Sequence, residues 1–113
     1  MTENKIVVAC LGSSTTAATW SYDWIGDLQS RPQNSTLRFV NLGVNGDLSW
    51  NALQRIGQVI ACKPDQVVVL IGANDVMALV ADARMKRIYK WRKKLPQPAS
   101  PGWFRENLTA IAQ

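Results

Sequence analysis

Histidine is absent from the 113-residue sequence, and cysteine occurs only twice, at Cys10 and Cys62. Common zinc sites use histidine or paired cysteines, and neither cysteine belongs to a Cys-x-x-Cys motif. We therefore expect no metal and no cofactor, and we interpret both cysteines as reduced, partly buried thiols. The apolar neighbours of Cys10 should raise the pKa of its thiol, which argues against Cys10 as a nucleophile.

Long apolar runs are also missing. The longest are the length of a strand, far short of the ~20 residues that span a membrane. The first ten residues, MTENKIVVAC, lack the basic segment and long apolar stretch of a secretory signal. If Met1 is the natural start, these features predict a cytoplasmic protein. No Gly-Lys-Ser or Gly-Lys-Thr sequence occurs, which excludes a Walker-type nucleotide hydrolase.

Acidic residues are missing from one segment, 84–94, which reads RMKRIYKWRKK and holds seven basic residues. The whole chain has a net charge of +5, so the other residues together carry −2. Because basicity is confined to one segment, no nucleic-acid partner is expected. The simplest interpretation is a solvated helix whose basic side chains pack their stems against the protein. The alternatives are a lid, or a helix that binds an anionic membrane surface or an acidic polymer.

What the sequence does contain is an alternation of strand and helix patterns. Near-continuous apolar runs predict buried parallel strands at 6–11, 37–42 and 66–71. Helical spacing predicts helices at about 19–30 and 48–62, with Asp47 or Ser49 as the cap of the second. Residues 76–95 predict one long helix or two short ones, and Ser100-Pro101 predicts the start of a last helix. This order predicts an α/β fold, a three-layer flavodoxin-like parallel sheet.

Three strands make a small sheet, and the last helix should lead into a fourth strand. We therefore interpret residues 1–113 as the N-terminal part of a single larger α/β domain, whose C-terminal strands are absent. An unpaired outer strand edge tends to self-associate, so a homo-oligomer is a further expectation.

Three loops should carry the functional site, because ligands of open parallel sheets bind beyond the carboxyl ends of the strands. The loops are 12–16, 43–47 and 72–75, and each contains glycine and small polar residues. Any one of them alone is a weak signal. Three polar loops that converge on one edge of the sheet are a stronger one.

The sequences of these loops resemble the motifs of the SGNH hydrolases, which are also called GDSL-type esterases and lipases. The first loop, Gly12-Ser13-Ser14-Thr15-Thr16, is similar to the family's Gly-Asp-Ser-x-Thr block. The segment Asn41-Leu42-Gly43-Val44-Asn45-Gly46-Asp47 matches the second block, and Gly72-Ala73-Asn74-Asp75 matches the third. The blocks occur in the family's order, each after a predicted strand, and the resemblance covers nearly the whole chain.

The resemblance implies a role for three residues. Ser14 would be the nucleophile that attacks an ester carbonyl, and its backbone N–H, that of Gly46 and the side-chain amide of Asn74 would form the oxyanion hole. A strand-to-helix turn at Ser14 favours negative charge, because N–H groups there are free. Structural roles are the alternatives: a helix cap for Ser14, a turn glycine at Gly46 and a left-handed turn residue at Asn74.

Several other loop residues should be structural. Asp47 and Asp75 should cap or brace the loops, and Gly43 and Gly72 should serve backbone geometry. Ser13 stands where the family usually has aspartate, so the register of the first block favours Ser14 over Ser13 as the nucleophile.

The family's general base is a histidine in a C-terminal Asp-x-x-His motif, and this chain has none. A serine hydroxyl is a weak nucleophile until a base takes its proton. The resemblance thus implies a serine esterase or lipase that hydrolyses a small-molecule or lipid ester, with its base beyond residue 113 and the chain inactive alone. Two alternatives stay open: a flavodoxin-like phosphate or FMN binder, and a non-catalytic relative with the same fold.

Overall fold

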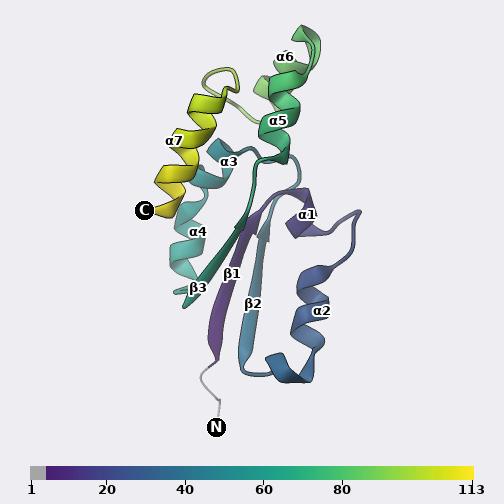
Figure 1. Cartoon of the computed structure of the whole chain (residues 1–113), viewed down its shortest axis with the longest axis vertical. Helices are drawn as coiled ribbons and strands as arrows, with labels where there is room; N and C mark the ends of the chain where they lie inside the picture. The colour runs from purple at the N-terminus through teal and green to yellow at the C-terminus, as the bar shows by residue number, and fades with distance from the viewer. Residues whose placement is uncertain (1–4) are drawn as a thin grey trace.

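The computed structural model describes residues 5–113 and contains one parallel sheet. Its strands are β1 (Ile6–Gly12), β2 (Leu37–Gly43) and β3 (Gln66–Leu70), and β1 lies between the other two. Figure 1 shows α5 and α6 beyond the end of the sheet where the strands finish. The predicted strands are confirmed to within one residue, and the α/β architecture with about three parallel strands is confirmed.

Helices cover both faces of the sheet, which gives three layers (Figure 1). The side chains of β1 alternate between the faces. Ala9 and Leu11 pack with residues of α3 (Ser49–Gln54), α4 (Ile56–Ala61) and α7 (Pro101–Ala112). On the other face, Val8 and Cys10 pack with Ile25 of α2 (Trp24–Ser30). The central strand is thus the most buried part of the chain and holds the site loops in place.

The predicted helix at 19–30 was wrong in its first part. A short helix, α1 (Ser14–Ala17), ends at Ala18 in the left-handed conformation, and α2 begins only at Trp24. Asp23 fixes that start, because its side chain accepts a hydrogen bond from the Gly26 N–H. Trp20 therefore lies in a loop, 85% exposed, and not on a buried helix face.

The predicted helix at 48–62 is divided at Arg55 into α3 and α4. Neither Asp47 nor Ser49 caps it. The N-cap residue is Leu48, whose N–H donates to Asn51 Oδ1 at 2.9 Å. The expected caps make other contacts: Asp47 pairs with two basic side chains, and Ser49 bonds to Asp75.

The expectation that all three strands are buried holds for β1 only: β2 is partly exposed, and β3 is wholly exposed. All five of its residues are exposed, whereas β1 is largely buried. The physical reason is position: β3 is an edge strand that pairs only with β1 among residues 5–113, and part of its surface is left uncovered.

The C-terminal third follows its sequence signals closely. Residues 76–95 form two helices, α5 (Ala73–Val80) and α6 (Ala83–Arg92), separated where Asp82 caps α6. Ser100 caps α7 by accepting the Trp103 N–H at 3.1 Å, with Pro101 in the first turn, as predicted. A second apolar cluster joins Leu48 at the start of α3, Ala78 of α5, Leu95 after α6 and Trp103 of α7. No helix within residues 5–113 is long and apolar enough to cross a membrane.

Candidate active site at the carboxyl ends of the strands

The first two predicted site loops leave the sheet side by side. Gly12 of β1 lies opposite Gly43 of β2 and Leu70 of β3 in the parallel register. The Val44 N–H donates to Gly12 O at 3.1 Å, which ties the second loop to the end of β1. The three loops therefore begin at the same level of the sheet, as the sequence predicted.

Ser14 is the first residue of α1, directly after the turn that follows β1. Its side chain is partly buried, whereas Ser13 is only 5% exposed, so Ser14 is the more accessible of the two serines. The Ser14 N–H has no acceptor among residues 5–113. Such a free N–H at a helix start is available to an anion.

Gly46 lies in the second loop with φ of +81°, a conformation that favours glycine. A Cβ atom at this position would lie 2.8 Å from Lys93 Cε, so a side chain would also displace that lysine. The Gly46 N–H, like that of Ser14, has no acceptor within the described part of the chain.

Asn74 is the second residue of α5, which follows Gly72 with φ of +133°. The Asn74 side-chain amide donates one hydrogen bond to Asp47 O at 3.0 Å. An amide nitrogen carries two hydrogens, so one donor is left over. Asn74 and Gly46 line the same pocket, whereas Ser14 does not line it.

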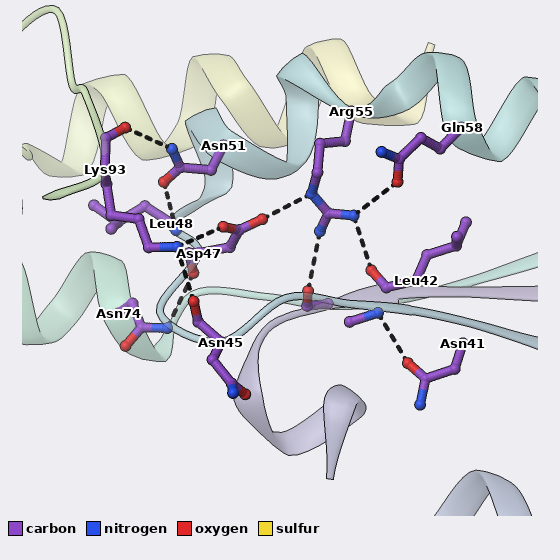
Figure 2. Close-up of polar contacts among 12 residues, drawn as sticks. Asn41, Leu42, Asn45, Asp47, Leu48, Asn51, Arg55, Gln58, Asn74 and Lys93 are labelled. Atoms are coloured by element: carbon purple, nitrogen blue, oxygen red, sulfur yellow. Dashed lines mark hydrogen bonds and ion pairs between the residues drawn. The ribbon is translucent and has the colours of Figure 1, made fainter. Parts of the chain in front are cut away.

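A group of three charged side chains, one buried acid and two partly buried bases, holds the second loop, as Figure 2 shows. We call Asp47, Arg55 and Lys93 the charge cluster. Asp47 accepts Arg55 Nε at 2.8 Å and Lys93 Nζ at 2.9 Å. Arg55 also donates to Gly12 O and Leu42 O, at the ends of β1 and β2. Asp47 therefore braces the loops, which is the role expected for it, while Arg55 and Lys93 were not identified from the sequence.

Lys93 also fixes one particular peptide bond. Lys93 Nζ donates to Asn45 O at 2.8 Å, and this carbonyl shares its peptide unit with the Gly46 N–H. No cis peptide occurs within residues 5–113, and a trans peptide directs its C=O and N–H to opposite sides. Lys93 thus holds the Gly46 N–H on the far side of the loop from itself. In Figure 2, Lys93 reaches the loop from one side and the purple helix α1 lies on the other.

Asp75 connects two of the helices that carry the site loops. Its carboxylate accepts the Ser49 hydroxyl at 2.6 Å and the Ser49 N–H at 2.9 Å, which joins α5 to the start of α3. Asn107 of α7 donates to Ser49 Oγ at 3.4 Å. Burial raises the pKa of Asp75, and the two bonds from Ser49 oppose that rise.

A pocket of about 510 Å³ adjoins Gly46 and Asn74. Its other wall is one face of α6, with Trp20 from the loop between α1 and α2. Outside this pocket, burial raises the pKa of Cys10, as the sequence suggested. Within residues 5–113 no group of three or more potential metal ligands gathers.

The order β2-β1-β3, all parallel with helices on both faces, defines a three-layer α/β protein of the flavodoxin-like class. Residues 10–113 match the sequence profile of the GDSL-like Lipase/Acylhydrolase family, and the chain belongs to that family. The resemblance seen in the three loops is confirmed. No curated protein matches the chain significantly.

Solved structures agree with this assignment. A lipase/acylhydrolase from Enterococcus faecalis is 25% identical, with a TM-score of 0.67, and the match covers 94% of this chain and 50% of that one. TesA is 26% identical, with a TM-score of 0.66 over 95% of this chain and 52% of its own. A variant of the esterase AlinE4 shares the fold, with 22% identity, a TM-score of 0.64, and coverage of 98% and 53%. The chain thus spans about half the length of these structures.

Proposed function

We propose that this chain carries the nucleophile and the oxyanion hole of a serine esterase. Ser14 Oγ would attack the ester carbonyl, form the acyl-enzyme bond and release the alcohol, and water would then hydrolyse the acyl-enzyme. The N–H groups of Ser14 and Gly46 and the side-chain amide of Asn74 would hold the oxyanion. Membership of a family of lipases and acylhydrolases supports this reaction class.

One observation carries the proposal. Ser14 and Gly46 lie on different loops, and both have a backbone N–H without an acceptor among residues 5–113. Free N–H groups near a serine at a strand-to-helix turn are what oxyanion stabilisation needs. The greater accessibility of Ser14 supports it over Ser13 as the nucleophile.

The proton acceptor for Ser14 is proposed to come from outside this chain. The sequence has no histidine. The two carboxylates of the site loops already have partners: Asp47 pairs with Arg55 and Lys93, and Asp75 bonds to Ser49. This arrangement supports the interpretation of residues 1–113 as the N-terminal part of a larger domain that supplies an Asp-x-x-His segment.

Hydrolysis of a chromogenic acetyl ester tests this proposal. The 113-residue chain should give little turnover, and a longer form with an Asp-x-x-His segment should give Ser14-dependent turnover. Substantial turnover by the short chain, abolished by Ser14→Ala, would show that the chain contains its own base.

The flavodoxin-like binder of phosphate or FMN has less support, because it gives no role to Gly46 or Asn74. A purified protein with a yellow flavin spectrum would favour it.

Contact of the segment 84–94 with an anionic membrane surface stays a proposal, supported by Trp91, which is 79% exposed among the basic side chains of α6. Vesicle binding that is insensitive to salt would argue against it.

A further inference from the structure

One wall of the pocket beside Gly46 and Asn74 is formed by α6. Four α6 residues line it, Met85, Ile88, Tyr89 and Arg92, at spacings that place them on one face of the helix. Three of them are apolar or aromatic, and Trp20 adds a further aromatic surface. The stripe from Met85 to Arg92 is about 10 Å long, at a helix rise of about 1.5 Å per residue.

The two ends of this stripe differ in chemistry. At the C-terminal end, Lys93 follows Arg92 directly and bonds to the loop of Gly46. Arg92 is therefore at the end of the stripe nearest the proposed oxyanion hole, and Met85 is at the far end. The pocket is polar beside Gly46 and Asn74 and apolar toward Met85.

The polar end is positively charged. The charge cluster sums to +1, because one carboxylate faces two basic groups. Arg92 adds a second positive charge and takes part in no ion pair within residues 5–113. No acidic side chain of the described residues lines the pocket. Its side-chain acceptors are neutral oxygens, those of Asn45, Asn74 and Tyr89, and the Asn45 oxygen is buried without a donor. Every polar side chain of its lining also carries at least one N–H or O–H donor.

We propose that this pocket selects esters that carry an anionic group, a carboxylate or a phosphate, close to the ester bond, with an apolar chain along the α6 stripe. Arg92 binds the anionic group, since a guanidinium presents paired N–H donors that suit both anions. This inference rests on the proposed function for the role of the pocket, although binding itself does not need Ser14 to react.

Binding of unreactive amphiphiles to the 113-residue chain tests the proposal, followed by NMR titration of the ¹⁵N-labelled protein. The probes are octanoate, octyl phosphate and the neutral octanamide, all with the same chain length. Octanoate, octyl phosphate or both should bind about three- to tenfold more tightly than octanamide and shift the Gly46 amide signal. Preference for one anion identifies which of the two the pocket takes. Equal binding of octanamide and both anions would overturn the proposal.

A matched pair of variants separates the pocket from the general basicity of α6. Arg92→Gln should abolish the preference for anions, while Arg87→Gln, on the same helix but lining a different pocket, should keep it. Both variants lose one positive charge, so an equal effect of the two would also overturn the proposal. Ser14→Ala should keep the preference. If the preference is found but the longer form with an Asp-x-x-His segment shows no Ser14-dependent turnover, the esterase proposal fails and the anion preference stands. If that turnover is found without the preference, only the anion preference fails.

Discussion

At the scale of single residues, the charge cluster holds the loop that carries the Gly46 N–H. Asp47 is nearly fully buried and receives both Arg55 and Lys93, so the loop of Gly46 is held from two directions. Breaking a buried pair leaves a charge without its partner, which costs more than the pair itself contributes. The charge cluster is therefore expected to matter for stability and for the direction of the Gly46 N–H.

Gly46→Ala should destabilise the fold, because φ is +81° and the added Cβ would lie 2.8 Å from Lys93 Cε. The expected loss is about 1–3 kcal/mol in the free energy of unfolding, measured with urea. Gly57→Ala in α4 is the control: a Cβ there meets nothing within 4 Å, and alanine should stabilise this helix by about 0.5–1 kcal/mol. Equal effects of the two substitutions would contradict this account of Gly46.

Lys93→Gln should remove the ion pair to Asp47 and loosen the Asn45–Gly46 peptide. Arg55 still pairs with Asp47, so we expect a loss of about 2 kcal/mol in urea unfolding. Lys86→Gln on exposed α6 should change stability by less than about 0.5 kcal/mol. If Lys93→Gln were as mild as Lys86→Gln, the cluster would not hold the loop.

The sequence predicted the positions of Ser14, Gly46 and Asn74 in three loops, but not the residues that fasten those loops. Lys93 is one of seven basic residues in 84–94, and nothing local distinguishes it. Its partners, Asn45 and Asp47, lie more than 45 residues away in sequence. Only the path of the chain from α6 back over the second loop selects this lysine.

At the scale of elements, the errors in the second predicted helix lay where a side chain had a tertiary partner. Asp47 and Ser49 have the chemistry of helix caps, yet tertiary partners take Asp47 into the charge cluster and Ser49 to Asp75. The division of the helix at Arg55 falls where that side chain reaches Gly12 O and Leu42 O. Strand ranges and the Ser100 cap were predictable because they depend on local pattern alone.

Asp75 links α5 to α3, and its raised pKa makes that link sensitive to pH. A carboxyl whose pKa is raised on folding contributes stability that is fully present below its ordinary pKa of 3.8. That contribution is lost as the pH rises through the raised pKa of the folded state. The free energy of unfolding of the wild type should therefore fall with pH relative to that of Asp75→Asn. A difference between the two that increased with pH would show that the carboxylate is instead stabilised when ionised.

At the scale of the whole molecule, the chain spans about half the length of the structures it matches, and β3 is an edge strand with an uncovered surface. Its edge away from β1 is unpaired among residues 5–113, and its apolar side chains are 38–48% exposed from Val67 to Leu70. The sequence predicted the strand but not its exposure, because an apolar run has the same residue pattern whether or not a further strand and helix cover it.

An unpaired apolar edge should make the 113-residue chain self-associate. Its molar mass, measured by light scattering after gel filtration, should rise with concentration. Val68→Lys on β3 should return it to a monomer, because a charge on the edge opposes pairing. Val80→Lys, at an exposed valine of α5, should leave the association unchanged. A wild type that stays monomeric at all concentrations would contradict the prediction.

The claim that Ser14 is a nucleophile without a base is tested most directly by adding a base. Imidazole should raise hydrolysis of a chromogenic acetyl ester by the 113-residue chain above the rate of imidazole with the ester alone. This extra rate should persist in Ser13→Ala, disappear in Ser14→Ala, and fall by about 10²–10³ when Asn74→Ala removes an oxyanion donor. An extra rate that survives Ser14→Ala, or no extra rate in the folded wild-type chain, would contradict the account.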